Sequence, residues 1–148
     1  MWRVLLLLLL SRISLAVGAA PAQLPAMREP VAADRVLVVS PHPDDESLCC
    51  AGYIQRAVAA GAQVTIVWMT AGDGFELDAL VVERHMHLKG SGLERLGLMR
   101  MNEARGAGRV LGVAPEQMIV LGYPDRGLRA LLGDYYSAPY RSRYTRSL

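Results

Sequence analysis

Runs of apolar residues, first continuous and then periodic, divide residues 35–70 into predicted secondary-structure elements. Residues 35–40 are mostly apolar and β-branched, which predicts a strand buried on both faces. From about residue 46 to residue 60 the apolar positions recur at helical spacing, and Gly61 fits the position just after a helix. Residues 63–70 predict a second strand. Segments of these lengths predict two parallel strands joined by a right-handed crossover. The apolar side of the helix comprises Cys50, Ile54 and Ala57.

The second half of the chain is predicted to contain two helical segments and a third strand. Residues 77–89 are compatible with a helix, and a glycine-rich break follows. A stronger helix is predicted over 93–111, and a strand at 118–121 leads into a turn at 122–125. Small residues on one side of the stronger helix allow it to lie close to the sheet. That packed side comprises Arg100, Ala104, Ala107 and Leu111.

The N-terminus has the composition of a targeting segment. Residues 1–22 combine the positive charge of Arg3, an apolar run and the small-residue site Ala20-Pro21-Ala22, which predicts a signal peptide. A retained membrane anchor is the alternative, although a charged residue leaves neither apolar part with the ~20 residues that a spanning helix needs. Residues 23–34 are predicted to be a linker and residues 35–148 the domain. The sequence therefore predicts a secreted or periplasmic protein, with membrane association as the alternative.

The composition indicates a globular protein. The 148 residues are 52% hydrophobic and 20% charged, with a formal net charge of +2. Much of the positive charge lies near the two ends, so no nucleic-acid groove is predicted. Interleaved Tyr and Arg at residues 135–144 would suit base stacking, but exposed coil or a substrate-side loop is favoured. Adjacent cysteines are poorly placed to pair, so no disulfide is predicted between Cys49 and Cys50. The oligomeric state does not follow from the sequence.

Acidic residues and glycines follow each of the predicted strands. Ligands of open parallel sheets bind beyond the carboxyl ends of the strands, so these loops should converge on one edge. His42 and Asp45 can reach one ion from a tight turn, and an imidazole with a carboxylate suits zinc. Asp44 is then a spare carboxylate that can accept a proton from a metal-activated water. The three loops are Pro41 to Asp45, Ala71 to Gly74 and Gly122 to Asp125.

The same acidic residues would also suit the start of a helix. Asp44 or Asp45 is a typical N-cap, and Glu46 a typical first-turn acid. A histidine, two prolines and two further acidic loops at the same edge favour a metal site, and the capping role stays open as the alternative.

These residues resemble the zinc-dependent LmbE-like/PIG-L de-N-acetylases over roughly residues 35–125. The family hallmark His-Pro-Asp-Asp-Glu matches residues 42–46 residue for residue. The resemblance implies a Rossmann-like three-layer α/β fold with a mostly parallel sheet, truncated here at the C-terminus. It also implies a zinc-dependent hydrolase that removes the acetyl group from an N-acetylglucosamine-type glycoconjugate. Supporting matches are Thr70 to Gly74, Arg100-x-x-Glu103-Ala104 and Gly122-Tyr123-Pro124-Asp125.

Carried over by position, the family pattern makes His42 and Asp45 zinc ligands and Asp44 the general base. Arg100 looks like the arginine at the substrate pocket, with an ion pair to the glutamate three residues on as the alternative. Asp125 looks like the acidic residue that holds sugar hydroxyls or orients the site, with a turn-forming role as the alternative. An acetylated amino-sugar conjugate is the expected partner.

A complete site of this kind needs histidines that the sequence does not contain. The family takes a third zinc ligand and a catalytic histidine from a later His-x-x-His segment. His85 and His87 are poor substitutes, because residues two apart on a helix point away from each other. The chain as written is therefore predicted to be a weak or inactive hydrolase. A non-catalytic sugar-conjugate-binding module is the main alternative. A nucleotide-binding domain is disfavoured because the first loop has no glycine cradle for phosphates.

Overall fold

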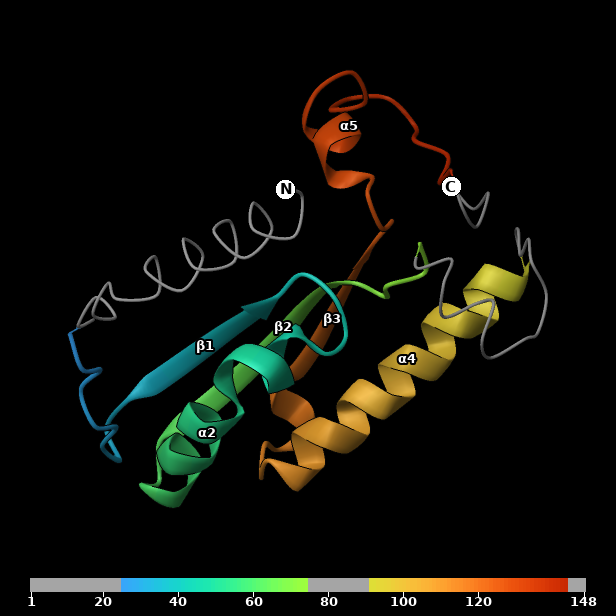
Figure 1. Ribbon diagram of the computed structural model, residues 1–148. Coiled ribbons are helices and arrows are strands. Elements are labelled where there is room, and N and C mark those ends of the chain that lie inside the picture. Colours follow the sequence, from blue (N-terminus) through green and yellow to red (C-terminus); the bar gives the residue numbers. More distant parts are fainter. Residues whose placement is uncertain (1–24, 75–90, 144–148) are drawn as a thin grey trace, which may run out of the picture.

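The computed structural model describes residues 25–74 and 91–143. A parallel sheet with strand order β1-β2-β3 has helices packed against it, which confirms the predicted α/β class (Figure 1). The strands are β1 (Arg35–Ser40), β2 (Gln63–Thr70) and β3 (Met118–Tyr123). The helices are α2 (Asp45–Ala59), α4 (Ser91–Val110), the short 3-10 helix η2 (Pro115–Gln117) and α5 (Leu128–Leu132).

Several predictions fall on residues outside the described ranges. The targeting segment at residues 1–22, the helix at residues 77–89 and the histidines within it are among them. Residues 25–34 form no helix or strand before β1. Within the described residues, no helix has the length and apolar character needed to cross a membrane.

The core lies between one face of the sheet and the two long helices. Val38, Ile66 and Met118 are neighbours across the three strands, so they share a face, and all three are buried. Residues of both crossover helices pack against this face, as expected when two right-handed crossovers advance in the same direction. The helix residues in this core include Ile54 and Ala57 of α2 and Met101 and Ala104 of α4.

The prediction that β1 is buried on both faces is wrong. Val38 is 8% exposed, whereas Leu37 is 64% exposed and Val39 55%. Side chains alternate between faces along a strand, and both long helices lie on the Val38 side. A continuous apolar run therefore occurs here in a strand that the described residues cover on one face only.

Two further details differ from the sequence predictions. Cys49 and Cys50 are joined by a disulfide, although no pairing was expected of adjacent cysteines. The peptide bond already holds their Cα atoms 3.8 Å apart, so no long loop has to close. At the other end of the sheet, β3 extends through Gly122 to Tyr123, which pairs with Thr70 across an irregular register, so the predicted turn begins later.

The one-sided burial of β1 can be tested with two substitutions of the same type at adjacent positions. Val38→Ala should lower the free energy of unfolding by about 2 kcal/mol, because it removes buried methyl groups and leaves a cavity. Val39→Ala should lower it by less than about 0.5 kcal/mol, because that side chain is exposed. Urea titrations of the two variants measure both values. Equal losses would contradict the exposure of the Val39 face.

Candidate functional site

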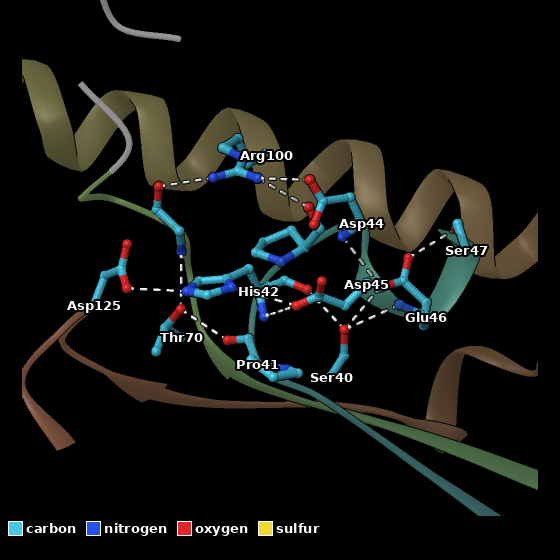
Figure 2. Close-up of polar contacts among 12 residues, drawn as sticks. Ser40, Pro41, His42, Asp44, Asp45, Glu46, Ser47, Thr70, Arg100 and Asp125 are labelled. Atoms are coloured by element: carbon cyan, nitrogen blue, oxygen red, sulfur yellow. Dashed lines mark hydrogen bonds and ion pairs between the residues drawn. The ribbon is translucent and has the colours of Figure 1, made fainter. Parts of the chain in front are cut away.

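The five residues selected from the sequence line one cleft at the carboxyl edge of the sheet. This cleft has a volume of about 400 Å³, and Figure 2 shows the polar contacts of the five residues. Its loops are tied together by Thr70, whose hydroxyl and backbone N–H both lie within hydrogen-bond distance of the Pro41 carbonyl, at 3.0 and 3.2 Å. The parallel strands thus bring the predicted loops to one place. The five selected residues are His42, Asp44, Asp45, Arg100 and Asp125.

Asp44 occupies the N-cap position of α2, but its carboxylate does not cap the helix. No hydrogen bond joins its side chain to the first-turn N–H groups. The backbone carbonyl of Asp44 accepts the N–H groups of Ser47 and Leu48 at 2.9 Å, while its Oδ2 lies 3.0 Å from Nη2 of Arg100. The side chain is 53% exposed. The capping interpretation therefore describes the position of this residue, whereas its carboxylate lies in the cleft.

Asp45 also directs its carboxylate away from the helix. It is the first residue of α2, and its Oδ2 accepts the backbone N–H of His42 at 2.9 Å. The same oxygen lies 3.3 Å from Nδ1 of the imidazole. On the other side of the ring, Nε2 lies 3.1 Å from Oδ1 of Asp125. His42 is thus held between two carboxylates, with 43% of its side chain exposed.

Arg100 is a buried residue that joins two of the loops. Its side chain projects from α4 and is 10% exposed. Nη1 donates to the carbonyl of Gly72 at 2.9 Å, and Nη2 donates to the carbonyl of Pro43 at 3.1 Å as well as to Asp44. Arg100 forms an ion pair with Asp44, which lies 56 positions away in the sequence. The alternative interpretation from the sequence was an ion pair with Glu103, three residues on.

Asp125 connects the third loop to the second. Its side chain is 7% exposed, and Oδ2 accepts the N–H of Gly74 at 3.2 Å. Its own N–H donates to Oδ1 of Asp73 at 3.2 Å. Burial, and secondarily the nearby charge of Asp125, raise the pKa of the Asp73 carboxyl against the lowering effect of that backbone hydrogen bond. Asp125 therefore does more than form a local turn, because it joins the third loop to the second.

Sequence reasoning missed three buried residues that are hydrogen-bonded to one another next to the first loop of the site: Ser40, Glu46 and Trp68. Glu46 is 1% exposed, and its Oε2 accepts the indole N–H of Trp68 at 2.9 Å. Ser40, at the end of β1, is also 1% exposed and lies 3.0 Å from the same carboxylate. The available signals were a polar residue ending an apolar strand and a third acid in the hallmark run.

The donor chemistry of the cleft fits part of a zinc site. An imidazole nitrogen and a carboxylate oxygen, those of His42 and Asp45, already face each other, and zinc takes such ligands. Catalytic zinc sites use three protein ligands. Within residues 25–74 and 91–143, no group of three or more His, Cys, Asp or Glu side chains is arranged to hold a metal. Among the described residues, His42 and Asp45 are therefore two side chains that a zinc site of this kind could use.

Comparisons with known proteins identify a family. The model of the PIG-L family, described as GlcNAc-PI de-N-acetylase, matches residues 37–144. A 1D-myo-inositol 2-acetamido-2-deoxy-alpha-D-glucopyranoside deacetylase from Nakamurella multipartita is 40% identical over 90 residues, covering 57% of this chain and 28% of the relative. A protein of the same name from Geodermatophilus obscurus is 40% identical over 92 residues, covering 62% of this chain and 30% of the relative. The chain thus spans less than a third of the length of these relatives.

Solved structures are also similar. The N,N'-diacetylchitobiose deacetylase of Pyrococcus horikoshii is 29% identical with a TM-score of 0.49, over 66% of this chain and 34% of that one. The 4-carboxy-2-hydroxymuconate hydratase GalB of Pseudomonas putida is 24% identical with a TM-score of 0.51, over 70% of this chain and 42% of that one. The second likeness supports the fold alone.

The packing of Arg100 against the second loop can be tested with two glycines. Gly72 and Gly122 both have positive φ angles, 66° and 72°, so alanine should cost about 1–2 kcal/mol of backbone strain at each. A Cβ at Gly72 would lie 2.8 Å from Cζ of Arg100, whereas one at Gly122 would meet nothing within 4 Å. Gly72→Ala should therefore lower the free energy of unfolding by at least about 1 kcal/mol more than Gly122→Ala. Equal losses in denaturant titrations would show that Arg100 does not occupy this position.

Proposed function

The chain belongs to the GlcNAc-PI de-N-acetylase (PIG-L) family, and we propose that its protein removes the acetyl group from an N-acetylglucosamine-type conjugate with the help of zinc. The observation that carries the proposal is the position of Asp44, whose carboxylate lies beside His42 and Asp45 in the cleft without capping α2. A carboxylate placed in this way can exchange a proton with the reacting groups. The named activity of the Nakamurella relative supports the substrate class.

We propose that His42 and Asp45 hold the zinc ion. In the tautomer with its proton on Nε2, the ring donates to Asp125 at 3.1 Å and leaves a lone pair on Nδ1, beside Asp45. Metal-binding histidines commonly donate their other N–H to a carboxylate in this manner. When bound, zinc supplies Lewis-acid chemistry: it polarises an amide carbonyl and lowers the pKa of a bound water to about 7. The third protein ligand has to come from outside the described residues.

The other residues of the cleft have separate tasks in this proposal. Asp44 accepts the proton of the attacking water. Arg100 holds the Asp44 carboxylate in place and is itself fixed by two backbone carbonyls, so it acts through Asp44 more than by facing the sugar. Asp125 orients the His42 ring and is too buried to offer much surface to a sugar hydroxyl.

A non-catalytic module that binds sugar conjugates is the second candidate. The buried network around Arg100 and Asp125 would be retained in either case, because it shapes the cleft. The two candidates differ in acetate release, which only the enzyme produces.

The proposal predicts distinct effects for metal and proton-transfer residues. In the full-length protein, the His42→Ala and Asp45→Ala variants should bind no zinc. They should also release no acetate from an N-acetylglucosaminyl-inositol substrate. Asp44→Asn should keep the zinc but lower kcat by about 10²- to 10⁴-fold, because the proton acceptor is removed. Elemental analysis measures zinc, and an acetate assay measures turnover.

Asp134 is an exposed carboxylate beyond α5, so Asp134→Asn is the matched control. This variant should keep wild-type zinc content and turnover. Wild-type protein that binds the sugar conjugate but releases no acetate would favour the binding module. Zinc content unaffected by His42→Ala would contradict the proposed metal site.

A further inference from the structure

Glu46 is a buried carboxylate surrounded by hydrogen-bond donors. Its Oε2 accepts the indole N–H of Trp68 at 2.9 Å and the backbone N–H of Asp44 at 3.2 Å, and the Ser40 hydroxyl lies 3.0 Å away. Its Oε1 accepts the hydroxyl of Ser47 at 3.0 Å. A buried charge is tolerated only with such a set of partners. Figure 2 shows the contacts of Glu46 with Ser40, Asp44 and Ser47, beside the cleft residues.

The N-terminus of α2 is satisfied in an unusual way. An N-cap aspartate normally accepts the N–H of the second or third helical residue with its own side chain. Here the second helical residue is Glu46, and its N–H donates to Oγ of Ser40 at 3.2 Å. The next N–H, that of Ser47, donates to the backbone carbonyl of Asp44. Ser40 therefore replaces the Asp44 carboxylate as the side-chain cap.

The backbone of Asp44 is also held in an uncommon conformation. Its φ is 139° and its ψ −31°, in a region that residues other than glycine rarely adopt. Such a conformation persists only when the surroundings fix it. Glu46 binds the N–H of Asp44, and Arg100 binds its carboxylate. The buried Glu46 thus fixes the backbone of Asp44, and Arg100 fixes its side chain in the cleft.

We propose that Glu46 is a positioning residue: Ser40 caps α2 in place of Asp44, Glu46 holds the backbone N–H of Asp44, and together they keep the Asp44 carboxylate in the cleft. The catalytic part of this inference rests on the proposed deacetylase function. The structural part does not, because it concerns only the hydrogen bonds of residues 40–47 and of the two side chains that contact them, Trp68 and Arg100. Oγ of Ser40 also lies 2.7 Å from the carbonyl oxygen of His42. Ser40 and Glu46 therefore contact the loop at His42 as well as at Asp44.

The test compares Glu46→Leu with Glu46→Gln in the full-length protein. Leucine leaves the N–H groups of Asp44 and Trp68 without an acceptor, whereas glutamine keeps one oxygen for them. Glu46→Leu should lower kcat by at least about tenfold with KM changed less than about threefold, since hydrogen bonds to charged groups are lost. Glu46→Gln should recover most of that loss. Hydrogen exchange should show the Asp44 amide at least about tenfold less protected in Glu46→Leu, relative to the amides of β2.

Ile66→Ala is the matched control, because it removes a fully buried side chain of the core and leaves the loop contacts in place. It should lower stability without a selective loss of protection at Asp44. If Glu46→Leu does not fold, Ser40→Ala decides the question, since it removes the acceptor of the Glu46 N–H and should deprotect that amide selectively.

The outcomes separate this inference from the proposed function. Wild-type protein without deacetylase activity contradicts the function, and the exchange data still decide the positioning role. Variants at Glu46 and Ser40 that behave like Ile66→Ala, with stability lowered and with kcat and local exchange unchanged, would overturn the inference.

Discussion

The hydrogen bonds at the start of α2 are the constraint on which the candidate site depends. The first N–H groups of a helix have no partners within it and must find acceptors elsewhere. In this chain a strand-end hydroxyl and a backbone carbonyl provide them. Two adjacent carboxylates are consequently left beside the positive end of a helix with their oxygens facing a cleft. The carboxylate of Asp44 makes no capping hydrogen bond to the helix, and that of Asp45 accepts the backbone N–H of His42.

The sheet and α4 bring the other residues of the cleft to the loop that precedes α2. Parallel strands bring the loops after β2 and β3 to the same edge, where Asp125 reaches His42 from 83 positions away. Small residues allow α4 to lie close to the core, so that the buried guanidinium of Arg100 can bind carbonyls from two loops together with the Asp44 carboxylate. Membership of the PIG-L family and this geometry support the same chemistry. The family relation supports the proposed amide hydrolysis, and in this proposal one short loop supplies the proton acceptor and two metal ligands.

Local patterns in the sequence predicted the three strands, the two long helices and the composition of the cleft, but neither η2 nor α5. Apolar runs located the strands, helical periodicity located α2 and α4, and strand-end acids located the loops. Features that depend on distant partners were out of reach. The pairing of Glu46 with Trp68 requires the start of α2 to lie against β2, and the pairing of Arg100 with Asp44 requires the docking of α4. The exposed face of β1 was misjudged for the same reason, because an apolar run does not reveal which side the helices cover.

In the proposed site, His42 and Asp45 bind a metal while Asp44 stays beside it as a proton acceptor. Anomalous diffraction at the zinc absorption edge, from crystals of the full-length protein grown with zinc, tests it most directly. The predicted result is one strong peak about 2.0–2.2 Å from a nitrogen of His42 and an oxygen of Asp45, with the Asp44 carboxylate outside the coordination shell. A peak ligated by Asp44 in place of Asp45, or no peak in the cleft, would contradict it.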